Sequence, residues 1–82
     1  MCFYVYILYS SSHDIYYKGF SEDVHQRLLY HNNNKSRFTA HKGPWQLVYV
    51  EEYPTKTDAL KREKQLKRQN RKYLEWLIQS KK

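Results

Sequence analysis

Five side chains of the 82-residue chain could together hydrolyse a phosphodiester bond. That reaction needs a base for the attacking water, a cation for the developing phosphate charge and help for the leaving oxygen. Arginine suits a phosphate oxygen because its planar guanidinium stays charged, and a lone carboxylate on an inner helix face can hold Mg²⁺ with water and substrate phosphate. A phenol, with a pKa of about 10, needs a nearby cation to act as a base. The candidates are Tyr6, Tyr17, Arg27, His31 and Glu63.

The two tyrosines lie in a predicted antiparallel hairpin over residues 3–19. Its first part alternates aromatic and branched aliphatic side chains, a short polar segment then turns the chain, and a second aromatic strand follows. Placing Tyr9 opposite Asp14 sets Tyr6 opposite Tyr17, with Cβ atoms about 5 Å apart on one face. A slip of one residue would send each tyrosine to the other face.

The arginine and the histidine lie on a predicted helix over residues 21–32, for which Ser21 is a good cap. Arg27 and His31 share one face with two apolar residues at helical spacing, so they should lean over the sheet beside the tyrosines. The alternative is that Arg27 only lays its stem along the core edge and that His31 is a half-buried surface histidine.

The rest of the chain predicts one more strand and two helices. Residues 45–52 form a nearly continuous apolar run, which is typical of the central strand of a sheet. Helices are expected over residues 55–69 and 71–79. On the last helix, we expect Tyr73 and Trp76 at the edge of the core in preference to an exposed stacking surface.

Glu63 occupies the middle of the core-facing arc of the helix over residues 55–69. A buried carboxylate is costly unless it is paired or binds a cation. Metal binding and a salt bridge to Arg27 are therefore the two interpretations. The residues expected to point elsewhere are Lys61, Arg62, Lys64 and Arg68.

The net charge of +7 is concentrated in the last third of the chain. Residues 1–55 hold five basic and five acidic side chains, whereas residues 56–82 hold ten basic and three acidic ones. A domain with its Lys and Arg clustered along one helical stretch has the electrostatic footprint of a polyanion binder. A solvated helix that keeps a small protein soluble is the alternative. A membrane surface is less favoured, because this stretch lacks a broad apolar face.

Length and composition predict a single cytoplasmic domain without disulfide, zinc site or membrane span. Cys2 is the only cysteine, no Cys/His spacing fits zinc, and no segment approaches the ~20 apolar residues of a transmembrane helix. The start of the chain lacks the basic leader of a signal peptide.

In their order along the chain, these motifs resemble the GIY-YIG endonuclease superfamily, in particular its small single-domain branch related to the incision domain of bacterial nucleotide-excision repair. The resemblance covers essentially the whole chain. Tyr4 stands where the first motif usually has Gly, and Lys18 stands at the Ile of the second. The matching stretches are Tyr4-Val5-Tyr6, Tyr17-Lys18-Gly19, Arg27-Leu28, His31-Asn32, Phe38-Thr39-Ala40, Gly43-Pro44-Trp45, Leu47-Val48-Tyr49, Glu51-Glu52, Ala59-Leu60 and Arg62-Glu63.

The resemblance implies an α+β fold over residues 1–82, with a three-stranded antiparallel sheet flanked by three to four helices. It further implies that Glu63 binds one divalent ion, Mg²⁺ or Mn²⁺. Tyr17 or Tyr6 would assist deprotonation of the attacking water. Arg27 would steady the phosphate, and His31 would take part in proton transfer or phosphate contact.

The partner expected from charge and resemblance together is DNA, with branched, damaged or single-stranded forms as candidates. No sequence-reading module is recognisable, so selection by DNA structure is expected in place of sequence. The chain would act in DNA repair or recombination, as a monomer or weak homodimer. A nucleic-acid binding module without turnover, or an interaction protein that uses its sheet edge, are the alternatives. The basic residues expected at the DNA are Lys18, Lys42, Lys64, Lys67, Arg68 and Arg71.

Overall fold

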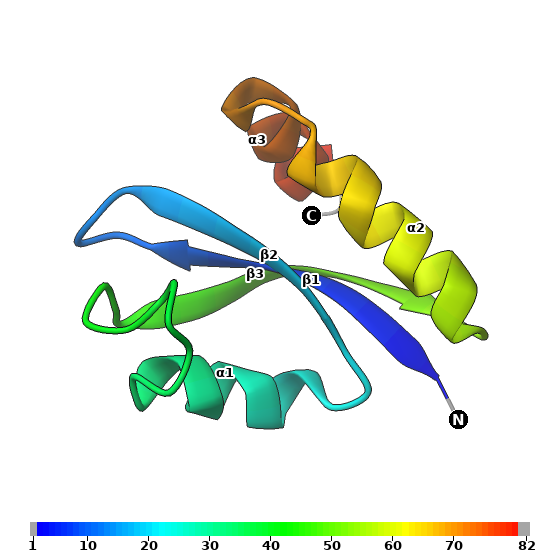
Figure 1. Ribbon diagram of the computed structural model, residues 1–82. Helices are drawn as coiled ribbons and strands as arrows, with labels where there is room; N and C mark the ends of the chain where they lie inside the picture. The colour runs from blue at the N-terminus through cyan, green and yellow to red at the C-terminus, as the bar shows by residue number, and fades with distance from the viewer. Residues whose placement is uncertain (1, 81–82) are drawn as a thin grey trace.

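A computed structural model describes residues 2–80 as a three-stranded sheet covered by helices on both faces (Figure 1). Helix α1 covers one face, and helices α2 and α3 cover the other, as the α+β prediction requires. None of the helices in this range is long and apolar enough to cross a lipid bilayer. In chain order the elements are β1 (Phe3–Ser10), β2 (Ile15–Ser21), α1 (Val24–Asn32), β3 (Trp45–Tyr53), α2 (Lys56–Lys67) and α3 (Arg71–Ser80).

The first strand, β1, is the centre of the sheet, and the prediction that residues 45–52 form the central strand is wrong. The strand order is β2-β1-β3 with both pairings antiparallel. Residues 5–8 are fully or almost fully buried because β1 has a strand on each side and helices on each face. Strand β3 is an edge strand whose apolar run resembles that of a central one, since its two faces are also partly covered.

The β1–β2 hairpin forms as predicted, but its register differs from the predicted one by two residues. Tyr9 pairs with Tyr16, and Tyr6 pairs with Gly19 in place of Tyr17. Asp14 has a left-handed backbone (φ 53°), which keeps it in the turn, where it accepts a hydrogen bond from the Tyr9 hydroxyl at 2.6 Å. A shift of two residues preserves the face of every side chain. Tyr6 and Tyr17 therefore still share one face, with ring centroids 6.4 Å apart.

The sheet separates two apolar clusters. One lies between the sheet and helices α2 and α3, and the other lies between the sheet and α1. The first has the buried residues Val5, Ile7, Tyr49, Ala59, Leu66, Leu74 and Leu77. The second has Tyr6, Leu8, Val24 and Trp45. Because side chains alternate along β1, this strand contributes to both clusters, and Tyr6 belongs to the α1 side.

The N-cap of helix α1 lies two residues after the predicted one. Asp23, not Ser21, is the N-cap, and its carboxylate accepts from the backbone N–H of Gln26 at 3.1 Å. The Ser21 hydroxyl instead accepts a hydrogen bond from the Asp23 N–H at 2.9 Å, which stabilises the turn before the helix. The helix ends at Asn32 as expected, and Asn34 takes up a left-handed backbone just beyond it.

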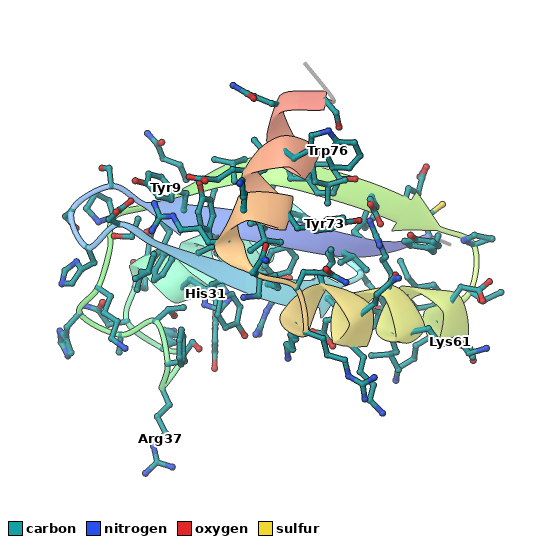
Figure 2. All side chains as sticks on the ribbon, turned by 90° about the horizontal axis from the view of Figure 1, so that it is seen from above. Tyr9, His31, Arg37, Lys61, Tyr73 and Trp76 are labelled. Carbon is teal, nitrogen blue, oxygen red and sulfur yellow. The ribbon has the colours of Figure 1, made fainter. Side chains whose placement is uncertain are left out.

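Two side chains of the C-terminal helices lie where the helical pattern did not place them. Arg62 was expected to point away from the core, but its guanidinium forms a two-pronged ion pair with Glu51 of β3, at 2.8 and 3.0 Å. Its long stem lets the guanidinium reach the sheet from a position at the side of the helix, which the angular position alone does not reveal. Trp76 was expected at the core edge and is 60% exposed, whereas Tyr73 does pack against the core (Figure 2).

Glu51 is the centre of a polar cluster that fastens α2 to the sheet. It also accepts hydrogen bonds from the hydroxyls of Tyr49 and Tyr53. Burial raises the pKa of the Glu51 carboxyl, but the hydrogen bonds from Arg62 and the two phenols outweigh it and hold the pKa below its usual value. The carboxylate is therefore charged at neutral pH, and three donors depend on it.

We predict that Glu51→Ala lowers the free energy of unfolding by about 3 kcal/mol, because it leaves Arg62 as an unpaired charge in a half-buried position. Glu52→Ala, at the exposed neighbouring position, should change it by about 0.5 kcal/mol or less. Urea denaturation of the two variants measures both values, and equal losses would show that the cluster does not fasten α2.

Candidate active site

The Tyr6 side chain lies so close to Gly19 that no other residue type fits there. A Cβ atom built on Gly19 would lie 2.5 Å from both Cζ and the hydroxyl oxygen of Tyr6, well inside van der Waals contact. Tyr6 is only 1% exposed. The glycine at the end of the predicted second strand thus provides the space in which the phenol lies, and this explains why the register brings these two residues face to face.

His31 holds the Tyr6 hydroxyl from the opposite side. Its Nε2 lies 3.1 Å from the Tyr6 oxygen, and its Nδ1 lies 2.7 Å from Oγ1 of Thr39, so both ring nitrogens have partners. The side chain is fully buried, and burial, followed by the charge of Arg27, lowers its pKa from 6.5 to about 4. His31 is therefore a neutral imidazole at pH 7, and the half-buried surface histidine considered as an alternative is excluded.

Arg27 lies beside the same phenol without being held in an ion pair within residues 2–80. Its guanidinium stacks on the Tyr30 ring at 4.3 Å, and its Nε is buried without a hydrogen-bond partner in this range. Burial raises the pKa of Tyr6, and a hydrogen bond from Arg27 lowers it in part, with the net shift upward. Arg27 thus retains donor capacity for an anion.

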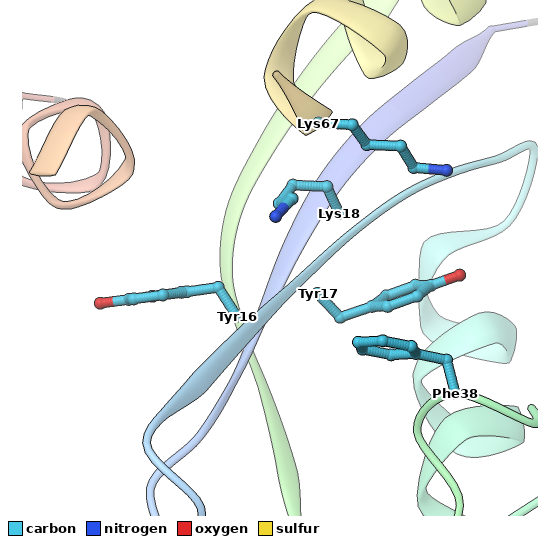
Figure 3. Close-up of a pocket in the computed structure, with 5 residues that line it drawn as sticks. All are labelled: Tyr16, Tyr17, Lys18, Phe38 and Lys67. Atoms are coloured by element: carbon cyan, nitrogen blue, oxygen red, sulfur yellow. The ribbon is translucent and has the colours of Figure 1, made fainter. Parts of the chain in front are cut away.

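Tyr17 joins the cluster from the next position on the same face of β2. Its ring centroid lies 4.7 Å from that of His31 and 5.7 Å from that of Phe38. Unlike Tyr6, it is only partly buried and lines a surface pocket (Figure 3). Of the two phenols, Tyr17 is the one that a bound molecule can reach directly.

Glu63 approaches this cluster from the other side of the sheet, since α2 and α1 cover opposite faces (Figure 1). Its side chain is 20% exposed and lies 3.7 Å from Nζ of Lys67, so its ion pair is with Lys67 and not with Arg27. Its negative charge contributes to the raised pKa of Tyr6, which means that the carboxylate acts electrostatically on the phenol. The structure therefore brings Tyr6, Tyr17, Arg27 and His31 together beside β2, and it places Glu63 on the other face within electrostatic range of Tyr6.

A single carboxylate is the metal-ligating set that this region offers. Within residues 2–80, no group of three His, Cys, Asp or Glu side chains could hold a metal ion. Mg²⁺ is commonly bound through one or two carboxylates, with waters and substrate phosphates completing its octahedron. Glu63 is partly exposed, and among the described residues its ion-pair partner is one exposed lysine, which fits such a site. A structural zinc centre, which needs four protein ligands, does not fit.

The six basic residues expected at a nucleic acid fall into three groups. Lys18 and Lys67 line the pocket that contains Tyr17. The Nζ atom of Lys42 lies 4.5 Å from the ring centre of Phe38, which also lines this pocket. Lys64 and Arg68 line a separate groove along α2, together with Lys61, which extends outward in Figure 2. Arg71 pairs with Asp14 and Glu75, so much of its charge is already balanced.

Two contributors to the region were not singled out from the sequence. Thr39 fixes the histidine ring from the loop between α1 and β3, and it is fully buried. Phe38 packs on Tyr17 although it is 56% exposed. Both lie in the matching stretch Phe38-Thr39-Ala40, and Phe38 is also the one large apolar residue of the long polar loop over residues 33–44. These signals point to the loop but do not reveal the contacts of either side chain. Their role depends on a loop conformation that no periodicity encodes.

Comparisons with known proteins agree on one family. The family described as the GIY-YIG catalytic domain matches residues 2–78. The chain is 39% identical over 77 residues to a UPF0213 protein of Staphylococcus epidermidis, covering 93% of each chain. It is 38% identical over 65 residues to one of Staphylococcus saprophyticus, covering 78% of each. The solution structure of a UPF0213 protein from Bacillus halodurans is similar with a TM-score of 0.63 and 33% identity, covering 99% of this chain and 86% of that one.

We predict that Gly19→Ala displaces the Tyr6 ring and lowers the free energy of unfolding by about 1–3 kcal/mol, as overpacking of a filled core does. Gly43→Ala is the matched control, since the Cβ atom there would lie 3.3 Å from its nearest neighbours. It should cost about 1 kcal/mol or less. Thermal or urea unfolding distinguishes the two, and an equal effect at both glycines would contradict the tight contact.

We also predict that the protein loses stability as the pH falls below 6.5, because His31 takes up a proton at pH 6.5 when unfolded but only at about pH 4 when folded. The stabilisation from the neutral imidazole is complete above pH 6.5 and falls by up to about 1.4 kcal/mol per pH unit below it. Unfolding measured from pH 7 to 5, above the main carboxylate titrations, tests this. An NMR titration of His31 beside the exposed His13 and His25 identifies the group responsible.

Proposed function

Because the chain belongs to the GIY-YIG family of nuclease domains, we propose that it is a divalent-metal-dependent endonuclease that hydrolyses phosphodiester bonds in DNA. The observation that carries this proposal is the convergence of Tyr6, His31 and Arg27 at Gly19, within the electrostatic reach of Glu63. Two phenols, a neutral imidazole, an arginine without an ion pair and a carboxylate are the side chains that the metal-dependent reaction needs.

In this proposal Tyr17 faces the attacking water, because it is the phenol that is open to the pocket. Tyr6 and His31 lie behind it as a hydrogen-bonded pair that positions the phenol. The neutral imidazole can accept a hydrogen bond at Nε2 from the Tyr6 hydroxyl, provided that Nδ1 carries its own proton toward Thr39 Oγ1. The position of Thr39 favours this tautomer, since its hydroxyl oxygen can accept from Nδ1.

Arg27 is assigned to the scissile phosphate. Its planar guanidinium remains charged and has no ion pair within residues 2–80, so it can contact a phosphate oxygen without breaking one. When bound at Glu63, a Mg²⁺ or Mn²⁺ ion would supply further positive charge to neutralise the developing phosphate charge. Lys67 would then be released from its ion pair with Glu63 and become available to a neighbouring phosphate.

The basic residues favour DNA as the polyanion and selection by structure over sequence. Lys18, Lys42 and Lys67 surround the pocket, and Lys64 with Arg68 extend the positive surface along α2. None of these contacts requires a particular base. We infer a single-domain enzyme of the cytoplasm that acts in DNA repair or recombination as a monomer or weak homodimer.

The proposal predicts that the purified protein nicks labelled branched, single-stranded or duplex DNA when Mg²⁺ or Mn²⁺ is present. Tyr17→Phe should reduce the rate by at least about 100-fold, in the range of a lost general base. Glu63→Gln should reduce it by at least about 100-fold as well, because it removes the charged ligand of the metal ion. Glu22→Gln changes an exposed carboxylate before α1 and should retain the rate, which makes it the matched control for Glu63. Gel assays with and without a chelator measure these rates.

Two outcomes would contradict the proposed endonuclease activity of this site. If no DNA in the panel is cut with either metal, but the DNA is bound with an affinity that falls steeply with salt, the chain is a nucleic-acid binding module. If cleavage persists equally in Glu63→Gln and in the wild type, the nuclease activity does not come from this site.

A further inference from the structure

A pocket beside the candidate active site combines exposed aromatic surface with two lysine side chains. It has a volume of about 360 Å³ and opens at the outer edge of β2, between the end of α2 and the loop that carries Phe38 (Figure 3). Its lining residues are Tyr16, Tyr17, Lys18, Phe38 and Lys67. Tyr17 belongs both to this pocket and to the cluster around His31, so a molecule bound here lies directly beside the candidate active site.

Phe38 is held in the exposed position by contacts on two sides. Its ring packs against Tyr17 with centroids 5.7 Å apart and planes inclined by 36°, and the ammonium of Lys42 lies 4.5 Å from its ring centre. More than half of the residue nevertheless remains in contact with solvent. A phenyl ring that is fixed but uncovered loses hydrophobic stabilisation and offers a flat surface on which another ring can stack.

The charges of the pocket favour an anionic occupant. Burial, followed by the nearby charge of Lys67, lowers the pKa of Lys18, so the two ammonium groups disfavour each other in the absence of an anion. Lys67 has only the partly exposed Glu63 as its ion-pair partner within residues 2–80. An aromatic platform flanked by lysines is the arrangement with which proteins bind single-stranded nucleic acids: bases stack on the rings while cations contact the backbone.

We propose that this pocket binds one unpaired nucleobase of a single-stranded DNA segment, stacked on Phe38, with the adjoining phosphates contacting Lys18 and Lys67. A base inside a duplex is paired and stacked on both faces, so its ring can reach Phe38 only if it is extruded. The pocket therefore selects DNA that is single-stranded or frayed next to the scissile phosphate. The reference to a scissile phosphate rests on the proposed function, whereas the binding of the base does not.

Binding measured in the presence of a chelator tests the proposal separately from catalysis. Fluorescence anisotropy gives the dissociation constant for a 12-nucleotide single strand and for the duplex of the same sequence. Phe38→Ala should weaken single-strand binding by about 5- to 100-fold, the loss of one stacked base, and should leave duplex binding nearly unchanged. Phe38→Tyr retains a ring and should restore the affinity. Trp76→Ala removes another exposed aromatic ring, one that does not line this pocket, and should change neither affinity.

A 2-aminopurine in the single strand supplies a second signal, because stacking on an aromatic ring quenches its fluorescence. Quenching by the wild type and by Phe38→Tyr, but not by Phe38→Ala, supports the proposal. Equal single-strand affinities for the wild type and Phe38→Ala would overturn it. Equal losses on single strand and duplex would overturn the single-strand selectivity and indicate an extruded base.

The binding and cleavage experiments separate the two proposals. Phe38-dependent binding of single strands without cleavage in Mg²⁺ or Mn²⁺ would retain the base pocket and reject the nuclease. Cleavage lost in Glu63→Gln, with single-strand binding unaffected by Phe38→Ala, would retain the nuclease and reject the pocket.

Discussion

The close contact between Tyr6 and Gly19 is the constraint around which the candidate site is built. A buried phenol against a residue without a side chain requires β1 and β2 to pair in one register, since a shift in either direction places a side chain where the ring lies. The same contact presents the hydroxyl to His31, which Thr39 orients from its other side. Strand register, histidine orientation and phenol position are therefore fixed by one packing arrangement.

Much of the site could be predicted because its residues follow local rules. Arg27 and His31 share a helix face, and Tyr6 and Tyr17 share a strand face, and neither relation depends on the global fold. The hairpin register depends on where the turn ends, which the left-handed backbone of Asp14 decides. The register was wrong by two residues, an even number, so the predicted face of each hairpin side chain is correct although the predicted partner of Tyr6 is not.

The incorrect predictions concern features that sequence patterns do not contain. Strand order depends on which apolar strand obtains two neighbours, and β1 and β3 look alike in hydrophobicity. Arg62 is a charged residue that the helical pattern places toward solvent, yet its guanidinium binds Glu51. The arrangement also includes the hydroxyls of Tyr49 and Tyr53 on β3 and of Tyr73 on α3. Thr39 contacts His31 only because of the path that the loop between α1 and β3 takes. Each depends on tertiary packing, which overrides the local pattern.

The candidate site lies at the edge of the sheet because its residues come from both faces of the sheet. Arg27 and His31 come from α1 on one face of the sheet, whereas Glu63 comes from α2 on the other face, and these groups can approach one another only at the edge of the sheet. The position of Glu63 then depends on how α2 is fastened, and the neighbouring Arg62 does this through Glu51. The polar cluster on β3 thus acts through the helix as a positioning element for the carboxylate. In the same way, the lack of a side chain on Gly19 determines where the Tyr6 ring can lie. A fold of this size can therefore keep the interiors of both clusters apolar and still assemble charged groups along the edge of β2.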